Sequence, residues 1–166
     1  MRQDIEGKIL RVFYEIPSRS FTIRDIMKIA KVPRATVHKY LVEFRNKGLV
    51  DKNNRAKNNL LFKTKKINYF VEKIIDSGII EGIIEKLNPS CIILFGSIRK
   101  GDSVKESDID LFVESSIKKE LFLEKYEKKL KHKIQLFVKD DIKNLQPNLF
   151  NNIINGIVLF GSFKIK

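Results

Sequence analysis

Two apolar stretches, one ending in Gly-Ser and the next opening on two aspartates, constrain this chain more than any other feature. The first runs from Cys91 to Phe95 and is followed by Gly96 and Ser97. After ten intervening residues the second begins with Asp108 and Asp110. Each stretch has the length of a buried strand. In a strand, two carboxylates two residues apart point to the same face.

This layout favours a site for a triphosphate and a divalent metal ion. Glycine lets the backbone approach phosphate closely, and N–H groups at the start of the following helix attract anionic oxygens. The two carboxylates repel each other unless a cation lies between them, and Mg²⁺ takes one or two carboxylates plus substrate phosphates. The alternative is a simple glycine turn followed by a solvated acidic strand.

Residues 78–166 resemble the minimal nucleotidyltransferases of the DNA polymerase β superfamily. The motif of that family is Gly-Ser, about ten residues and Asp-x-Asp, which Gly96, Ser97, Asp108 and Asp110 match. The resemblance implies that the two aspartates are catalytic and bind Mg²⁺ or Mn²⁺. It also implies that Gly96 and Ser97 contact a nucleoside triphosphate substrate.

The turn before Gly101 usually carries a basic residue in this family. Lys100 is the closer match and Arg99 is the second candidate, and either side chain suits contact with a phosphate. An ordinary solvated loop is the alternative. Gly101 itself and Ser107 also fit the family pattern.

One position departs from the family pattern. Family members commonly carry a third carboxylate on a later strand, and the matching residue here is Gln135, in the strand expected from Ile134 to Val138. An amide forms hydrogen bonds but takes no proton and adds no charge to a metal site. Glu114, Asp140 and Asp141 are nearby acids, although none occupies the matching position.

Positive charge is concentrated in the first part of the chain. Residues 1–66 hold 17 Lys and Arg against 6 Asp and Glu, whereas residues 67–166 hold 16 against 14. Such an asymmetry indicates a nucleic-acid partner for the first part. The alternative is a solvated basic surface.

The basic segment has the pattern of three short helices. Apolar residues recur at helical spacing from Asp4 to Glu15, and Thr22 with Asp25 predicts a capping box at the start of a second helix. Pro33 is placed to begin a third helix, which Gly48 ends. The order predicts a helix-turn-helix.

A β-hairpin is expected after the third helix. Leu49 and Val50 form its first strand, residues 51–59 its polar tip, and Leu60–Phe62 its second strand. Three helices and a hairpin resemble a winged helix-turn-helix domain, although a small helical domain without a DNA role is the alternative.

Double-stranded DNA is the partner that this resemblance implies. The first residues of the recognition helix reach base edges in such domains, and basic residues on the hairpin contact phosphates. The candidate DNA-binding residues are Arg34, Thr36, His38 and Lys39 in the third helix, and Arg55 and Lys57 in the hairpin.

The remainder of the chain alternates helices and strands, which predicts a small α/β domain with a mixed sheet. The fold class is therefore α+β: a winged helix-turn-helix domain (1–64), linking helices (65–88) and a nucleotidyltransferase-like domain (89–166). The expected helices are 67–77, 79–87, 116–131 and 145–154, and the expected strands are 91–95, 108–113, 134–138 and 157–160.

The single cysteine, Cys91, excludes an intrachain disulfide and favours a reducing cytoplasm. The apolar runs are too short to span a bilayer, so no membrane partner is expected. Two histidines far apart in sequence, without a cysteine set, do not indicate a zinc site.

Two functions stay open at this point. The first is a Mg²⁺-dependent transfer of NMP from an NTP to a protein or nucleic-acid hydroxyl, by an enzyme that also binds DNA. Small relatives often modify a partner toxin, so this enzyme would be antitoxin-like and control its own operon. The second is a DNA-binding regulator, with homodimers as one possibility, whose degenerate transferase domain senses nucleotide. A weaker third idea is RNA presented to the transferase site.

Overall fold

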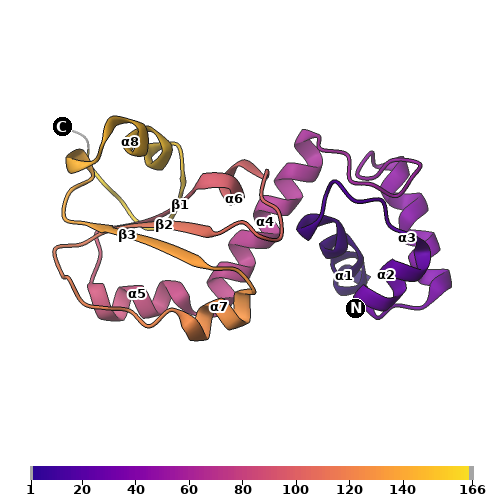
Figure 1. Cartoon of the computed structure of the whole chain (residues 1–166), viewed down its shortest axis with the longest axis horizontal. Helices are drawn as coiled ribbons and strands as arrows, with labels where there is room; N and C mark the ends of the chain where they lie inside the picture. The colour runs from indigo at the N-terminus through magenta and orange to yellow at the C-terminus, as the bar shows by residue number, and fades with distance from the viewer. Residues whose placement is uncertain (1, 165–166) are drawn as a thin grey trace. The chain divides into compact units, whose positions relative to one another are not determined.

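The computed structural model describes residues 2–164 of the chain (Figure 1). They form two compact units. The first comprises the residues up to Lys66 together with Ser103–Lys105, and the second comprises Ile67–Asp102 and the residues from Glu106 onward. Among the described residues no helix is both long and apolar enough to cross a membrane.

The first unit contains the three predicted helices, α1 (Arg2–Glu15), α2 (Ile23–Ala30) and α3 (Arg34–Asn46). Their core is aromatic at its centre, with Phe13, Phe21 and Phe44 almost fully buried. The predicted capping box is confirmed, because the backbone N–H of Asp25 donates to Thr22 Oγ1 at 3.1 Å and the carboxylate of Asp25 accepts from the backbone N–H of Thr22 at 3.0 Å.

The predicted second strand of the hairpin, Leu60–Phe62, is wrong. These residues begin α4 (Leu60–Ser77) instead. The side chain of Asn59 accepts a hydrogen bond from the backbone N–H of Phe62 at 2.9 Å, which satisfies a free donor of the first helical turn. The Phe62 ring is fully buried, with its centroid 5.4 Å from that of Tyr14. A local cap and this buried contact therefore outweigh the strand pattern.

A much shorter hairpin remains. Val50 and Ala56 form an isolated antiparallel bridge. Hydrogen bonds from Asp51 N to Arg55 O at 2.8 Å and from Lys57 N to Leu49 O at 2.9 Å extend it on either side. Its tip therefore consists of residues 52–54 and is shorter than the predicted tip, residues 51–59.

The second unit contains a four-stranded mixed sheet. Its strands are β1 (Cys91–Phe95), β2 (Ile109–Glu114), β3 (Ile134–Lys139) and β4 (Ile157–Gly161), in the order β3-β2-β1-β4. β1 is antiparallel to both of its neighbours, and β2 and β3 are parallel. The predicted fold class, helices followed by a mixed sheet with helices, is confirmed.

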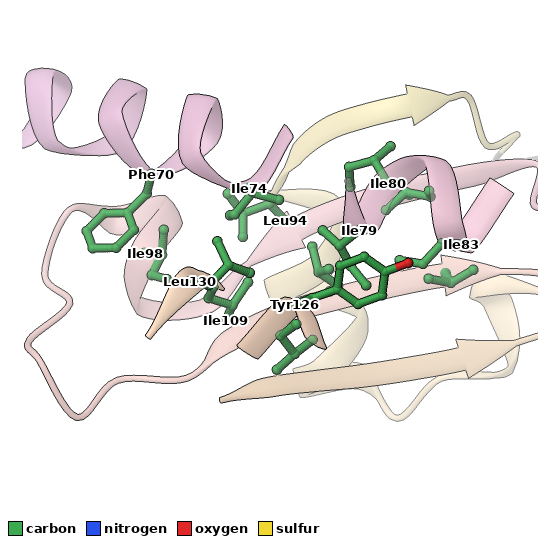
Figure 2. Packing of buried hydrophobic residues seen from close by; sticks show 14 of the residues in the cluster. Phe70, Ile74, Ile79, Ile80, Ile83, Leu94, Ile98, Ile109, Tyr126 and Leu130 are labelled. Atoms are coloured by element: carbon green, nitrogen blue, oxygen red, sulfur yellow. The ribbon is translucent and has the colours of Figure 1, made fainter. Parts of the chain in front are cut away.

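Helices cover both faces of this sheet. On one face lie α4, α5 (Ile79–Leu87) and α7 (Glu124–Leu130), and on the other lies α8 (Pro147–Ile154) (Figure 1). Figure 2 shows the larger cluster, in which Phe70 and Ile74 of α4 and Ile83 of α5 pack against sheet residues such as Leu94. The smaller cluster includes Phe95, Phe112 and Ile153. The two central strands, β1 and β2, are thus covered on both faces, which explains their continuous apolar runs, whereas the edge strands β3 and β4 are partly exposed.

Two predicted helices begin later than expected. The helix expected from Ser116 starts only at Glu124, and residues 116–123 are not helical. Ser115 Oγ accepts a hydrogen bond from the backbone N–H of Ile117 at 3.0 Å, a local bond that competes with helix formation. The helix expected from Leu145 starts at Pro147, where a residue without an N–H suits the first turn.

Candidate functional site

The carboxylate of Asp110 lies against the backbone of Gly96. The Cα atoms of Phe95 and Asp110 are partners in the β1–β2 ladder, so the residue that follows Phe95 is brought next to the aspartate. Gly96 has φ of +74°, and a Cβ atom added there would lie 1.9 Å from Asp110 Oδ2. Only glycine therefore fits this conformation and leaves room for the carboxylate.

Asp108 and Asp110 are close enough to influence each other. Asp108 directly precedes β2 and Asp110 is its second residue, and both side chains are half-buried. Burial raises the pKa of Asp110, and the neighbouring negative charge of Asp108 raises it further. Two crowded carboxylates in a partly dehydrated place attract a cation.

Gln135 lies beside the two aspartates. Its Cα is the partner of Asp110 in the parallel β2–β3 ladder. Its amide Nε2 donates to Asp108 Oδ2 at 2.6 Å, while the residue itself stays exposed. Three strand ends thus bring Gly96, Asp108, Asp110 and Gln135 to one place.

The nearby acids named from the sequence lie elsewhere. Glu114 is at the other end of β2, four residues from Asp110, which corresponds to roughly 13 Å along a strand. Its Oε1 accepts from the backbone N–H of Ile142 at 3.0 Å. Asp141 accepts from the backbone N–H of Lys143 at 2.8 Å, and Asp140 accepts from that of Asp141 at 3.1 Å. These three acids therefore form hydrogen bonds with the loop after β3 and lie away from the aspartate pair.

The short helix α6 (Gly96–Lys100) carries the other predicted nucleotide-binding residues. Ser97 is half-buried in its first turn, and Ile98 is fully buried and fastens the helix to the core. Arg99 is half-buried and Lys100 is exposed. The helix ends at Gly101, which has φ of +73°.

The donor set fits a divalent ion bound together with a triphosphate. Asp108 and Asp110 could supply two carboxylates, which would leave the other positions of an octahedral ion to phosphates and water. Among residues 2–164, no group of three or more His, Cys, Asp or Glu side chains is arranged to hold a metal ion. A divalent ion held by the two aspartates would therefore need further ligands, such as phosphates and water.

One supporting residue was missed by sequence reasoning. His132 is buried, and its Nδ1 lies 2.7 Å from the carbonyl oxygen of Ser107, the residue directly before Asp108. The ring of Phe70 packs edge-on against the His132 ring, with centroids 5.3 Å apart. No local pattern predicts this contact, because its partners are 25 residues apart in the chain.

The candidate DNA-binding residues all lie in the first unit. In α3, Arg34, His38 and Lys39 are exposed and Thr36 is half-buried, whereas Val37, Tyr40, Leu41 and Phe44 of the same helix are buried. Arg55 and Lys57 are exposed on either side of Ala56, in the second arm of the short hairpin. The polar side of α3 and the hairpin arm are thus both open to a partner.

Asn54 fastens the hairpin tip to the helices, a link that the sequence did not reveal. Its Oδ1 accepts from Arg45 Nη2 of α3 at 2.5 Å. Its Nδ2 donates to the carbonyl oxygen of Phe21 at 3.0 Å, and the backbone N–H of Phe21 donates to the carbonyl oxygen of Asn54 at 3.1 Å. The tip is held at three points.

Comparison with known proteins finds a match within the second unit. No curated protein matches the chain. A family model does match, and its match begins at residue 77, so the three N-terminal helices lie outside it. The matched segment contains Gly96, Asp108, Asp110 and Gln135, and it supports a general nucleotidyl-transfer function. Residues 77–155 match the family model described as a nucleotidyltransferase domain.

Proposed function

We propose that this chain transfers the NMP group of a Mg²⁺-bound nucleoside triphosphate to a hydroxyl group of a protein or nucleic acid. The observation that carries the proposal is the fit of Asp110 against Gly96, with Asp108 beside it. The match of residues 77–155 to a nucleotidyltransferase domain supports the same reaction class.

The residues of the site have separate roles in this reaction. Asp108 and Asp110 would hold Mg²⁺ or Mn²⁺, which supplies positive charge for the leaving pyrophosphate. Gly96 and Ser97 would contact the phosphates, together with Lys100 or Arg99. The acceptor oxygen forms a bond to the α-phosphorus as the bond from that phosphorus to the bridging oxygen breaks. Pyrophosphate then leaves with the electron pair, and the acceptor proton passes to solvent, because Gln135 has no basic atom.

Calorimetry with Mg·ATP and Mg·GTP tests the metal and nucleotide roles. The unmodified chain is expected to bind one of them, and Asp108→Asn/Asp110→Asn is expected to lose Mg²⁺-dependent binding. Asp76→Asn removes one exposed acid of α4 and serves as the control. Equal binding by the unmodified chain and the double variant would overturn the assignment.

A second candidate function is a DNA-binding regulator whose transferase domain only senses nucleotide. The hydrogen bond from Gln135 to Asp108 favours it, because an amide stands where the resemblance places a carboxylate. Labelled NTP offered with the protein, a candidate partner toxin or RNA separates the two functions. Covalent label on any of them supports the transferase, and nucleotide binding without label supports the regulator.

For the N-terminal unit we propose binding to double-stranded DNA in the cytoplasm, with self-regulation of an antitoxin-like operon. Its excess of positive charge and the exposed polar side of α3 support this proposal. Binding to the protein's own upstream DNA is expected to weaken steeply as salt rises, because phosphate contacts release counterions. An anisotropy titration at two salt concentrations tests it, and salt-independent binding or no binding would remove the DNA role. Light scattering during the titration shows whether a homodimer is the bound form.

A further inference from the structure

The hydrogen bond from Gln135 to Asp108 has a consequence for the number of metal ions in the site. Asp108 Oδ2 accepts the Gln135 amide at 2.6 Å, so one carboxylate oxygen already has a donor. The Gln135 Cα is paired with that of Asp110, which brings the amide to the edge of the acidic pair. The amide thus lies where a further cation would otherwise approach Asp108.

The negative charge of the site also limits the number of metal ions that it can hold. A two-ion site holds its ions about 3.5–4 Å apart, and their mutual repulsion has to be offset by anionic ligands. Asp108 and Asp110 are the two carboxylates of this cluster, and Glu114, Asp140 and Asp141 are engaged in loop contacts at the far end of the strands. Among residues 2–164 no group of three acids or other metal-ligating side chains replaces them.

An amide is a poor substitute for a third carboxylate. Its oxygen is a neutral ligand, and its NH₂ group is a donor that repels a cation. When the NH₂ group faces Asp108, as it does here, the partial positive charge of the donor lies next to the acidic oxygen. A carboxylate at this position would reverse the sign of that interaction.

We infer that this site binds a single divalent ion with its nucleotide, because Gln135 stands where a second ion would need a third carboxylate. The inference rests on the proposed nucleotide site and deepens it. The ion is held by Asp108 and Asp110 and by the phosphates. Gln135 acts as a positioning residue, since it fixes the orientation of the Asp108 carboxylate through its hydrogen bond.

Counting bound Mn²⁺ tests the inference without any need for turnover. The full chain is dialysed against Mn²⁺ with a saturating non-hydrolysable α,β-methylene analogue of ATP or GTP, and bound Mn²⁺ and bound nucleotide are both measured. We expect one Mn²⁺ per bound nucleotide in the unmodified chain and two in Gln135→Asp. Gln146→Asp adds the same charge at an exposed position at the start of α8 and is expected to keep one.

A second variant separates the added charge from the lost hydrogen bond. Gln135→Leu removes the donor to Asp108 without adding an acid, so it is expected to keep one ion. Two ions in the unmodified chain, or one ion in a folded Gln135→Asp, would overturn the inference and leave the proposed nucleotide site intact. If the unmodified chain binds neither Mn²⁺ nor nucleotide, both the proposed function and this inference are overturned.

Discussion

Oδ2 of Asp110 occupies the space next to Gly96 that any larger residue would need for its Cβ atom. The separation would be 1.9 Å, well inside van der Waals contact, and Gly96 also has φ of +74°. Glycine is therefore required for two separate reasons: the backbone has a positive φ, and the Asp110 carboxylate leaves no space for a Cβ atom. Because the neighbour is a carboxylate of the proposed site, substitution here is expected to change that site as well as the stability of the fold.

Gly96→Ala is expected to lower Mg·nucleotide affinity by about tenfold or more. The left-handed conformation costs a non-glycine residue about 1–2 kcal/mol, and Asp110 has to move to relieve the clash. Calorimetry measures the affinity and urea unfolding measures the stability. Gly78→Ala is the matched control, because Gly78 has φ of +82° but nothing within 4 Å of an added Cβ. An equal loss of affinity in both variants would argue against a steric role for Asp110.

The raised pKa of Asp110 predicts how stability depends on pH. Burial, followed by the charge of Asp108, raises this pKa, so between the ordinary aspartate pKa and the raised value the folded chain binds more protons than the unfolded chain. Stability from this group is therefore present at low pH and lost as pH rises through that window. Urea unfolding at a series of pH values is expected to show this fall in the unmodified chain and a weaker one in Asp110→Asn. A steeper fall in Asp110→Asn would contradict the prediction.

Secondary structure that depends on local pattern was predicted well. The capping box of Thr22 and Asp25, the strand Cys91–Phe95 and the helix Ile79–Leu87 follow from spacing and caps within a few residues. Two errors arose where tertiary contacts or side-chain caps override periodicity. The side chain of Asn59 caps the first turn of α4, where a strand was expected. Ser115 forms a local hydrogen bond with Ile117, and the apolar residues of the segment that follows pack on the core without forming a helix.

The candidate site was predictable only in part, for a related reason. The motif identified Gly96, Asp108 and Asp110 because their spacing is local, and their roles stay predictions. The hydrogen bond between Gln135 and Asp108 depends on the parallel pairing of β2 with β3, which no local pattern determines. The same holds for the contact of His132 with Ser107 and for the link from Arg45 to Asn54.

Gln135→Asp is expected to increase any nucleotidyl transfer by the chain. The new carboxylate adds a group that can accept the acceptor's proton, and general-base contributions are on the order of 10²–10⁴-fold in rate. Labelled-NTP transfer onto the acceptor identified for the unmodified chain measures the rate, with Gln146→Asp as the charge-matched control. An unchanged rate would show that another group accepts the proton or that none is needed.

Asn54→Ala is expected to weaken DNA binding by releasing the hairpin from α3. The variant loses the hydrogen bonds to Arg45 and Phe21, and it also places alanine at φ of +53°, which asparagine tolerates better. Anisotropy with the upstream DNA is expected to show a several-fold loss of affinity. Asn53→Ala, at an exposed position of the same tip, is the control. A loss of the same size in both variants would indicate a general effect of the tip and not the link to α3.

The exposed basic residues of the first unit are expected to divide into two classes. Arg34→Ala and Lys39→Ala, on the exposed side of α3, are expected to relax sequence preference, since each good bidentate contact to a base discriminates by about 1–3 kcal/mol. Arg55→Ala and Lys57→Ala, in the hairpin arm, are expected to weaken binding to all sequences alike and to lower the salt slope by about one each, because a phosphate contact carries no sequence information.

Competition between the upstream DNA and a shuffled sequence, at several salt concentrations, measures the sequence preference and the salt slope of each variant. Lys52→Ala is a further control, as an exposed cation at the tip that is not among the proposed contacts. If the α3 variants lower the salt slope without changing the preference between the two sequences, α3 contacts only phosphates. The DNA role would then be that of a non-specific anchor, because sequence is read through base edges and not through the backbone.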